Sequence, residues 1–199
     1  MHALIMAGGE GSRLGLGEKP LVCIHGRPMI QWVIEAFSDA GCSPVVVLSS
    51  KTPYTRNWCR ANSIPFILAD GNGYLEDLIY AVTALEEGGP IFTSVSDIPC
   101  ISADIIRSVS ESHRRSGMEA CSTWVPVSLC REVGTEPRYL CEIDGVPASP
   151  VGVNILQGSK IGEVQEELCL LLNTRELVFN VNTRSELALL EQYFQSDHS

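Results

Sequence analysis

The chain begins with a short apolar run that leads directly into a glycine-rich segment. The apolar residues 4–6 predict a buried strand. Four glycines follow within positions 8–15, and they let the backbone approach a polyphosphate closely and direct amide N–H groups at its oxygens. Arg13 and Lys19 add positive charge to the same segment. The opening therefore predicts a strand followed by a phosphate-binding loop.

This loop differs from the two common glycine-rich phosphate loops. A P-loop needs Ser or Thr directly after its Lys, where the hydroxyl binds magnesium, whereas Pro20 follows Lys19. A dinucleotide fingerprint needs Gly-x-Gly-x-x-Gly, whereas Leu14 stands at the third glycine position. The next predicted strand, residues 45–48, ends in two serines instead of the acid that binds a ribose hydroxyl. The sequence argues against both classes.

Short apolar runs alternate with amphipathic stretches along the chain, which predicts an α/β layered sheet. No linker divides the 199 residues, so we expect a single domain over 1–199, with a nucleotide half at about 1–100 and an acceptor half at about 101–199. We expect strands at residues 4–6, 45–48, 66–68, 91–95, 121–127, 139–143, 151–156 and 177–180. We expect helices at residues 28–37, 55–62, 75–85, 103–116, 163–172 and 185–194, and a loop at 128–138.

The formal net charge of −10 argues against nucleic acid and anionic membranes as partners. Residues 1–60 hold six Lys/Arg and four Asp/Glu, whereas residues 61–199 hold eight and twenty, so the glycine loop lies at the basic end. No apolar run is long enough to span a membrane, and the signal-peptide pattern is missing. We therefore expect a soluble, cytoplasmic protein.

Eight cysteines and four histidines are scattered along the chain without a Cys-x-x-Cys pair or other ligand spacing. Several of the cysteines lie in apolar segments, where a thiol acts as a small hydrophobic side chain. We expect no structural metal.

Asp97 follows the most apolar predicted strand, residues 91–95. Ligands of open α/β sheets bind at the carboxyl ends of strands, where a carboxylate can hold a divalent cation that bridges phosphate oxygens. The alternative is an acid that only precedes the next helix.

Asn180 and Asn182 form a second candidate cluster. Alternation along a strand would point both amides to the same side, toward the carboxyl edge of the sheet. The alternative is a strand-to-helix turn in which Thr183 is the N-cap of the last helix.

Three further segments are weaker candidates. Glu76 and Asp77 follow a glycine turn at 71–73, and their carboxylates could accept hydrogen bonds from the ring N–H and amino group of guanine. The alternative is that these acids only stabilise the first turn of the helix through its dipole. Thr52 lies in the segment 49–53, which could line the ribose or base. Residues 152–154 could bring backbone close to an acceptor, although both of these last segments are more often plain loops.

The sequence shows no Ser/His/Asp nucleophile and no histidine cluster. A phosphate acceptor needs no general base, because its oxygen is already anionic near neutral pH. Catalysis would then rest on positioning and charge neutralisation.

The opening segment as a whole resembles the signature of nucleotidyltransferases with a GT-A-like fold: Leu-x-x-Ala-Gly-Gly-x-Gly-x-Arg-x-Gly, a short gap, then Lys-Pro-Leu. The resemblance implies a three-layer, Rossmann-like α/β fold with a mostly parallel mixed sheet. It also implies that Asp97 is a metal ligand and that Arg13 and Lys19 neutralise a triphosphate. The signature stands here as Leu4, Ala7, Gly8, Gly9, Gly11, Arg13, Gly15, Lys19, Pro20 and Leu21.

Residues 73–78, 152–154 and 179–183 narrow this resemblance to the archaeal adenosylcobinamide-phosphate guanylyltransferases. That family implies transfer of GMP from GTP to adenosylcobinamide phosphate, a corrinoid phosphate, with release of pyrophosphate during cobalamin biosynthesis. Molybdenum-cofactor guanylyltransferases, or other NTP transferases with a phosphate acceptor, are the nearest alternatives. A non-catalytic GTP-binding regulator is a second alternative. The oligomeric state stays open, with a homodimer as one candidate.

The predicted site combines these segments. The catalytic residues are Arg13, Lys19 and Asp97. Mg²⁺, where the reaction uses it, would be held by Asp97 and Asn182. The GTP-binding set is Leu4, Ala7, Gly8, Gly9, Gly11, Ser12, Arg13, Lys19, Thr52, Gly73, Glu76, Asp77 and Asp97, and the acceptor-binding set is Gly152, Asn154, Asn180 and Asn182.

Overall fold

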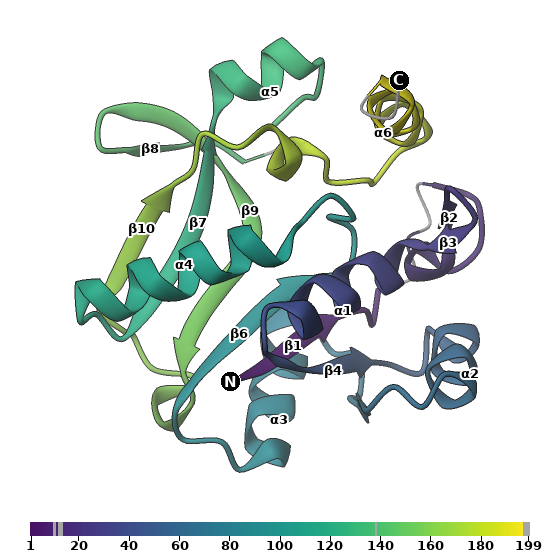
Figure 1. Ribbon diagram of the computed structural model, residues 1–199. Helices are drawn as coiled ribbons and strands as arrows, with labels where there is room; N and C mark the ends of the chain where they lie inside the picture. Colours follow the sequence, from purple (N-terminus) through teal and green to yellow (C-terminus); the bar gives the residue numbers. More distant parts are fainter. Residues whose placement is uncertain (10, 12–13, 138, 197–199) are drawn as a thin grey trace.

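The computed structural model describes residues 1–9, 11, 14–137 and 139–196 (Figure 1). Within these residues an eight-stranded sheet has the order β10-β7-β9-β6-β1-β4-β5, with β8 paired to β9. Only β9 and β8 introduce antiparallel pairs, so the sheet is mixed and mostly parallel, as predicted. The strands are β1 (His2–Met6), β4 (Ser43–Leu48), β5 (Phe66–Leu68), β6 (Pro90–Val95), β7 (Ala120–Pro126), β8 (Cys141–Ile143), β9 (Val146–Gln157) and β10 (Glu167–Leu171).

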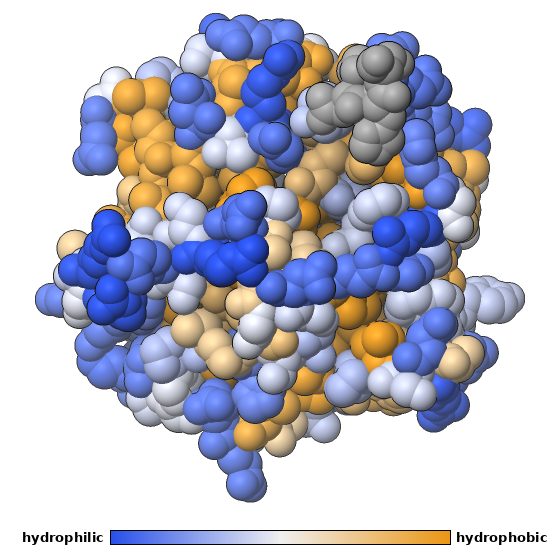
Figure 2. All heavy atoms as spheres, in the orientation of Figure 1, coloured by the Kyte–Doolittle hydropathy of each residue, from blue (hydrophilic) through white to orange (hydrophobic). Residues whose placement is uncertain are grey.

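Helices cover both faces of the sheet and give the three predicted layers. On one face, α1 (Met29–Asp39) and α4 (Ala103–Ser116) cover the larger core, where Phe37 packs edge-on against Phe92. On the other face, α3 (Tyr74–Leu85) buries Leu78, Ala81 and Val82 against β1 and β4. Figure 2 shows hydrophilic residues along the outer side of α4, so its apolar face is directed at the sheet.

Smaller elements complete the chain. A two-stranded ribbon of β2 (Cys23–Ile24) and β3 (Arg27–Pro28) precedes α1, and a 3-10 turn, η1 (Lys19–Leu21), precedes the ribbon. The remaining elements are α2 (Pro53–Ala61), α5 (Val127–Val133), η2 (Gly158–Lys160), η3 (Arg175–Val178) and α6 (Arg184–Ser196). Among the described residues, no helix combines the length and apolar character that crossing a membrane requires.

Three sequence-based predictions are wrong. The segment 163–172 is not a helix, because Glu167–Leu171 forms β10, which pairs parallel to β7. The segment 177–180 is not a strand, because its first two residues belong to the 3-10 turn η3 and it has no partner in the sheet. The predicted loop at 128–138 contains α5, a short helix that Gly134 ends with φ of 85°.

Candidate active site

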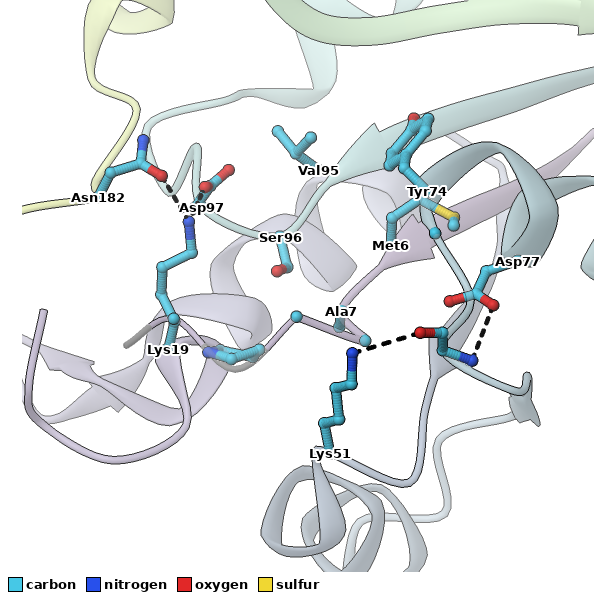
Figure 3. Close-up of a pocket in the computed structure, with 16 residues that line it drawn as sticks. Met6, Ala7, Lys19, Lys51, Tyr74, Asp77, Val95, Ser96, Asp97 and Asn182 are labelled. Atoms are coloured by element: carbon cyan, nitrogen blue, oxygen red, sulfur yellow. Dashed lines mark hydrogen bonds and ion pairs between the residues drawn. The ribbon is translucent and has the colours of Figure 1, made fainter. Parts of the chain in front are cut away.

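The glycine loop leaves β1 at the carboxyl edge of the sheet. The amide of Ala7 donates to the Val47 carbonyl at 2.8 Å, which extends the pairing of β1 with β4 by one residue. The Ser49 hydroxyl then donates to the Gly8 carbonyl at 2.6 Å. From there the loop lines a cavity of about 390 Å³ (Figure 3). The predicted phosphate-binding loop is therefore the floor of a pocket.

Gly11 brings the two ends of the loop together. Its φ is 62°, and a Cβ added there would lie 2.4 Å from the Cβ of Lys19. Glu18 fixes the far end of the loop, because its carboxylate accepts from the amides of Tyr54 and Thr55 at 2.8 and 2.7 Å at the start of α2. Arg184 of α6 donates to the Leu14 carbonyl at 3.2 Å. Lys19 is therefore held at a defined place in the pocket.

Gly11→Ala is expected to weaken nucleotide binding about tenfold, because the new methyl group must displace Lys19, and to cost about 1–2 kcal/mol in left-handed backbone strain. Gly17→Ala is the matched control: Gly17 also has a left-handed φ, of 86°, but no atom lies within 4 Å of its added Cβ. Chemical denaturation and nucleotide titration of both variants test this. Equal nucleotide affinity in the two variants would contradict it.

Lys19, Asp97 and Asn182 form one cluster at the edge of the cavity (Figure 3). The Lys19 ammonium pairs with Asp97 Oδ2 and donates to Asn182 Oδ1 at 2.9 Å. The Lys19 and Asp97 side chains are only 16% and 9% exposed. Asp97 lies two residues beyond β6, and its carbonyl accepts from the Val181 amide at 2.9 Å. Three segments far apart in sequence thus meet at one ion pair.

The turn before α6 positions Asn182. The amides of Asn182 and Thr183 donate to Glu186 Oε2 at 2.7 and 2.8 Å, and the Thr183 hydroxyl accepts from the Glu186 amide at 3.2 Å. This is a capping box, so Thr183 has the N-cap geometry that the sequence predicted. Asn180 is not on a shared strand with Asn182; its carbonyl accepts from the Asn182 amide group at 3.3 Å.

The donor set at Asp97 fits a magnesium ion. Asp97 Oδ1 is buried and has no hydrogen-bond partner among the described residues. Mg²⁺ takes oxygen ligands, commonly one or two carboxylates completed by substrate phosphates and water. Asp97 Oδ1 and the Asn182 side-chain oxygen supply such ligands, beside the loop that would carry the phosphates. No cluster of three or more His, Cys, Asp or Glu suited to a metal occurs in the described part of the chain.

A second cavity of about 320 Å³ adjoins the first. The two cavities share Val95, Asp97 and Asn182. The second cavity lies between α5, residues 135–137 and 139, β9 and the turn before α6. The ion-paired cluster therefore stands between two compartments. The other residues that line the second cavity are Val125, Cys130, Thr135, Glu136, Pro137, Tyr139, Ser149, Pro150, Leu177, Val178, Asn180 and Glu186.

Most of the predicted GTP-binding residues that the structure describes line the first cavity. Three do not line it. Leu4 is buried in the core within β1, and Thr52 is buried at the start of α2, where its hydroxyl donates to the Ser49 carbonyl. Glu76 is exposed to solvent. Ser12 and Arg13 lie outside the described residues. The predicted residues that line the first cavity are Ala7, Gly8, Gly9, Gly11, Lys19, Gly73, Asp77, Asp97 and Asn182.

The predicted acceptor residues separate into two groups. Asn180 and Asn182 line the second cavity, whereas Gly152 and Asn154 line neither. Gly152 has φ of 87°, and an added Cβ would lie 2.9 Å from Val95 Cγ2, so this glycine lets β9 approach a neighbouring side chain. Asn154 lies within β9, opposite Thr93 of β6.

Sequence reasoning missed several residues that line the first cavity. Ser96 precedes Asp97 directly and Val95 lies one residue earlier, whereas Pro20, Lys51 and Gly71 lie in the predicted signature, the segment 49–53 and the predicted turn, so proximity to a predicted residue was the available signal. The cavity-lining residues outside the predicted site sets are Met6, Pro20, Lys51, Gly71, Tyr74, Val95 and Ser96.

Comparisons with known proteins show the family and the fold. The family described as the MobA-like NTP transferase domain matches residues 3–147. An adenosylcobinamide-phosphate guanylyltransferase from Methanocaldococcus jannaschii is 30% identical, over 99% of both chains. The structure of CMP:2-keto-3-deoxy-manno-octonic acid synthetase complexed with CTP superposes with a TM-score of 0.75 at 16% identity, over 98% of both chains. Molybdopterin-guanine dinucleotide biosynthesis protein A from Archaeoglobus fulgidus superposes with a TM-score of 0.69 at 17% identity, over 98% of this chain and 100% of that one. At these identities the two structures share the fold.

Proposed function

The chain belongs to the MobA-like NTP transferase family, and we propose that it transfers GMP from GTP to the phosphate group of adenosylcobinamide phosphate. The products are adenosylcobinamide-GDP and pyrophosphate. The relative that is 30% identical over nearly the full length of both chains supports this choice of substrates. A cytoplasmic location and a homodimeric state stay predictions.

The observation that carries the proposal is the Lys19–Asp97–Asn182 cluster between two cavities. A nucleotidyl transfer joins two substrates at the α-phosphorus, so it needs two adjoining sites with a fixed positive charge where they meet. The first cavity has the glycine loop and Lys19 for the triphosphate. No glycine of the described ranges lines the second cavity; apolar and polar side chains line it together with the carboxylates of Glu136 and Glu186, and this mixed lining suits the body of an acceptor.

The residues around this cluster account for the chemistry without a nucleophilic side chain. The acceptor phosphate is already anionic and attacks the α-phosphorus directly. Lys19 and the loop amides hold the triphosphate and stabilise charge on the leaving pyrophosphate. Asp97 and Asn182 would hold a Mg²⁺ ion, which when bound neutralises charge on phosphate oxygens. Catalysis then consists of positioning and charge neutralisation.

A panel of nucleotides and acceptors tests the proposal. GTP, ATP, CTP and UTP are each mixed with adenosylcobinamide phosphate or molybdopterin in the presence of Mg²⁺, and pyrophosphate release and product mass are measured. We expect turnover with GTP and adenosylcobinamide phosphate. Cobinamide without its phosphate is the control and should give no product.

Each other result has a defined meaning. Turnover with molybdopterin alone would identify a molybdenum-cofactor guanylyltransferase instead. Nucleotide binding with no turnover on either acceptor would favour a GTP-binding regulator.

A further inference from the structure

The first cavity has a second polar end, away from Asp97. Figure 3 shows Lys51 and Asp77 on opposite sides of the turn at Gly71. The Lys51 ammonium donates to the Gly71 carbonyl at 3.3 Å, and Asp77 Oδ1 accepts from the Gly71 amide at 2.9 Å. All three residues line the cavity. The turn at Gly71 therefore has a cation at its carbonyl and a carboxylate at its amide.

Both groups keep hydrogen-bonding capacity. An ammonium has three donors, and Lys51 uses one of them on Gly71 without forming an ion pair with any described carboxylate. Asp77 is buried, and its second oxygen, Oδ2, forms no hydrogen bond with another residue of the described ranges. This end of the cavity thus offers a strong donor beside a strong acceptor.

The surroundings suit a flat ring. Met6 and Tyr74 line the cavity close to Asp77 in Figure 3, and the Tyr74 side chain is partly exposed. A purine has apolar faces that pack against such side chains, and its edge carries the hydrogen-bonding groups. Because Lys19 and Asp97 lie at the other end, a nucleotide with its phosphates at Lys19 would place its base here.

We infer that Lys51 and Asp77 together select guanine, with the Lys51 ammonium donating to O6 and the Asp77 carboxylate accepting from N1–H and the 2-amino group. This inference rests on the proposed function for its nucleotide. Guanine presents an acceptor next to two donors on this edge, which is the complement of Lys51 and Asp77. Adenine presents an amino donor at position 6, which would face the Lys51 ammonium and leave the carboxylate without a donor.

Competition binding separates the two contacts. Affinities of GTP, ITP, 6-thio-GTP, ATP and inorganic triphosphate are measured for the wild type, Lys51→Met, Lys51→Arg and Asp77→Asn. ITP lacks the 2-amino group, and 6-thio-GTP replaces O6 with sulfur, a weaker acceptor. The side-chain amide introduced by Asp77→Asn keeps an oxygen for the Gly71 amide and replaces the other oxygen with an NH₂ donor, so the turn is preserved.

We expect Lys51→Met to bind GTP about tenfold more weakly and to lose its preference for GTP over 6-thio-GTP, whereas Lys51→Arg retains that preference. Asp77→Asn is expected to lose the preference for GTP over ITP. Binding of inorganic triphosphate should be unchanged in all three variants.

Two results would overturn the inference: an unchanged GTP to 6-thio-GTP ratio in Lys51→Met, or triphosphate binding that falls as much as GTP binding, which would place Lys51 on the phosphates. These results differ from failure of the proposed function. Guanine selection without transfer to any acceptor would overturn the function alone, and a wild type that binds no nucleotide would overturn both.

Discussion

Lys19→Ala is expected to lower kcat/KM for nucleotidyl transfer by about a thousandfold. Lys19 lines the first cavity, and its ammonium contacts Asp97 and Asn182, which line both cavities. Under the proposed function, this ammonium neutralises the negative charge that builds on the leaving pyrophosphate. Its low exposure strengthens the effect, because charges interact more strongly away from water.

Stability must be measured beside the rate. Removing Lys19 leaves the Asp97 carboxylate buried without its partner, which costs about 3 kcal/mol. The double variant Lys19→Met with Asp97→Asn removes both charges and should regain stability without regaining activity. Lys160→Ala removes a lysine that pairs with Glu119 away from both cavities, and it should keep full activity. A transfer rate for Lys19→Ala near that of the wild type would exclude Lys19 from the reaction.

The strands and helices that the sequence predicted well are those with long or regular patterns. The spacing of Met29, Ile30, Val33, Ile34 and Phe37 marks one helical face, and all five are buried in α1. The segment that became β10 is different, because a short run of Leu and Cys after several Glu and Gln fits a helix as well as a strand. Only its pairing with β7 decides between them, and that pairing is tertiary.

In the candidate site, too, some features follow from the local sequence and others depend on tertiary contacts. Asp97 and the glycine loop could be placed because both follow parallel strands, whose carboxyl ends meet at one edge. Membership of the MobA-like family confirms the resemblance read from the opening motif. The position of Gly152 could not be interpreted correctly, since a glycine that allows close approach looks the same whether the neighbour is a ligand or Val95. The segment 49–53 was predicted as a candidate, but the choice of Lys51 over Thr52 within it depends on the turn at Gly71, which Lys51 contacts.

Asp97→Asn is expected to lower kcat by about a thousandfold while the protein stays folded. The amide matches the carboxylate in shape, and its oxygen can still accept from Lys19. Its nitrogen replaces Oδ1, the buried oxygen without a hydrogen-bond partner in the described ranges, and an amide nitrogen does not ligate Mg²⁺. The change therefore removes one negative charge and one proposed metal ligand without opening a cavity.

Rates measured over a range of Mg²⁺ concentrations distinguish this role from a structural one. If Asp97 only fixed Lys19, the Asn variant would keep most of its activity, because the contact with the ammonium survives. If Asp97 holds the metal through Oδ1, activity stays low and the Mg²⁺ concentration needed for half-maximal rate rises. Asp104→Asn makes the same chemical change on the surface of α4 and should alter neither quantity. An Asp97→Asn rate within about tenfold of the wild type at ordinary Mg²⁺ would show that the reaction does not depend on this carboxylate.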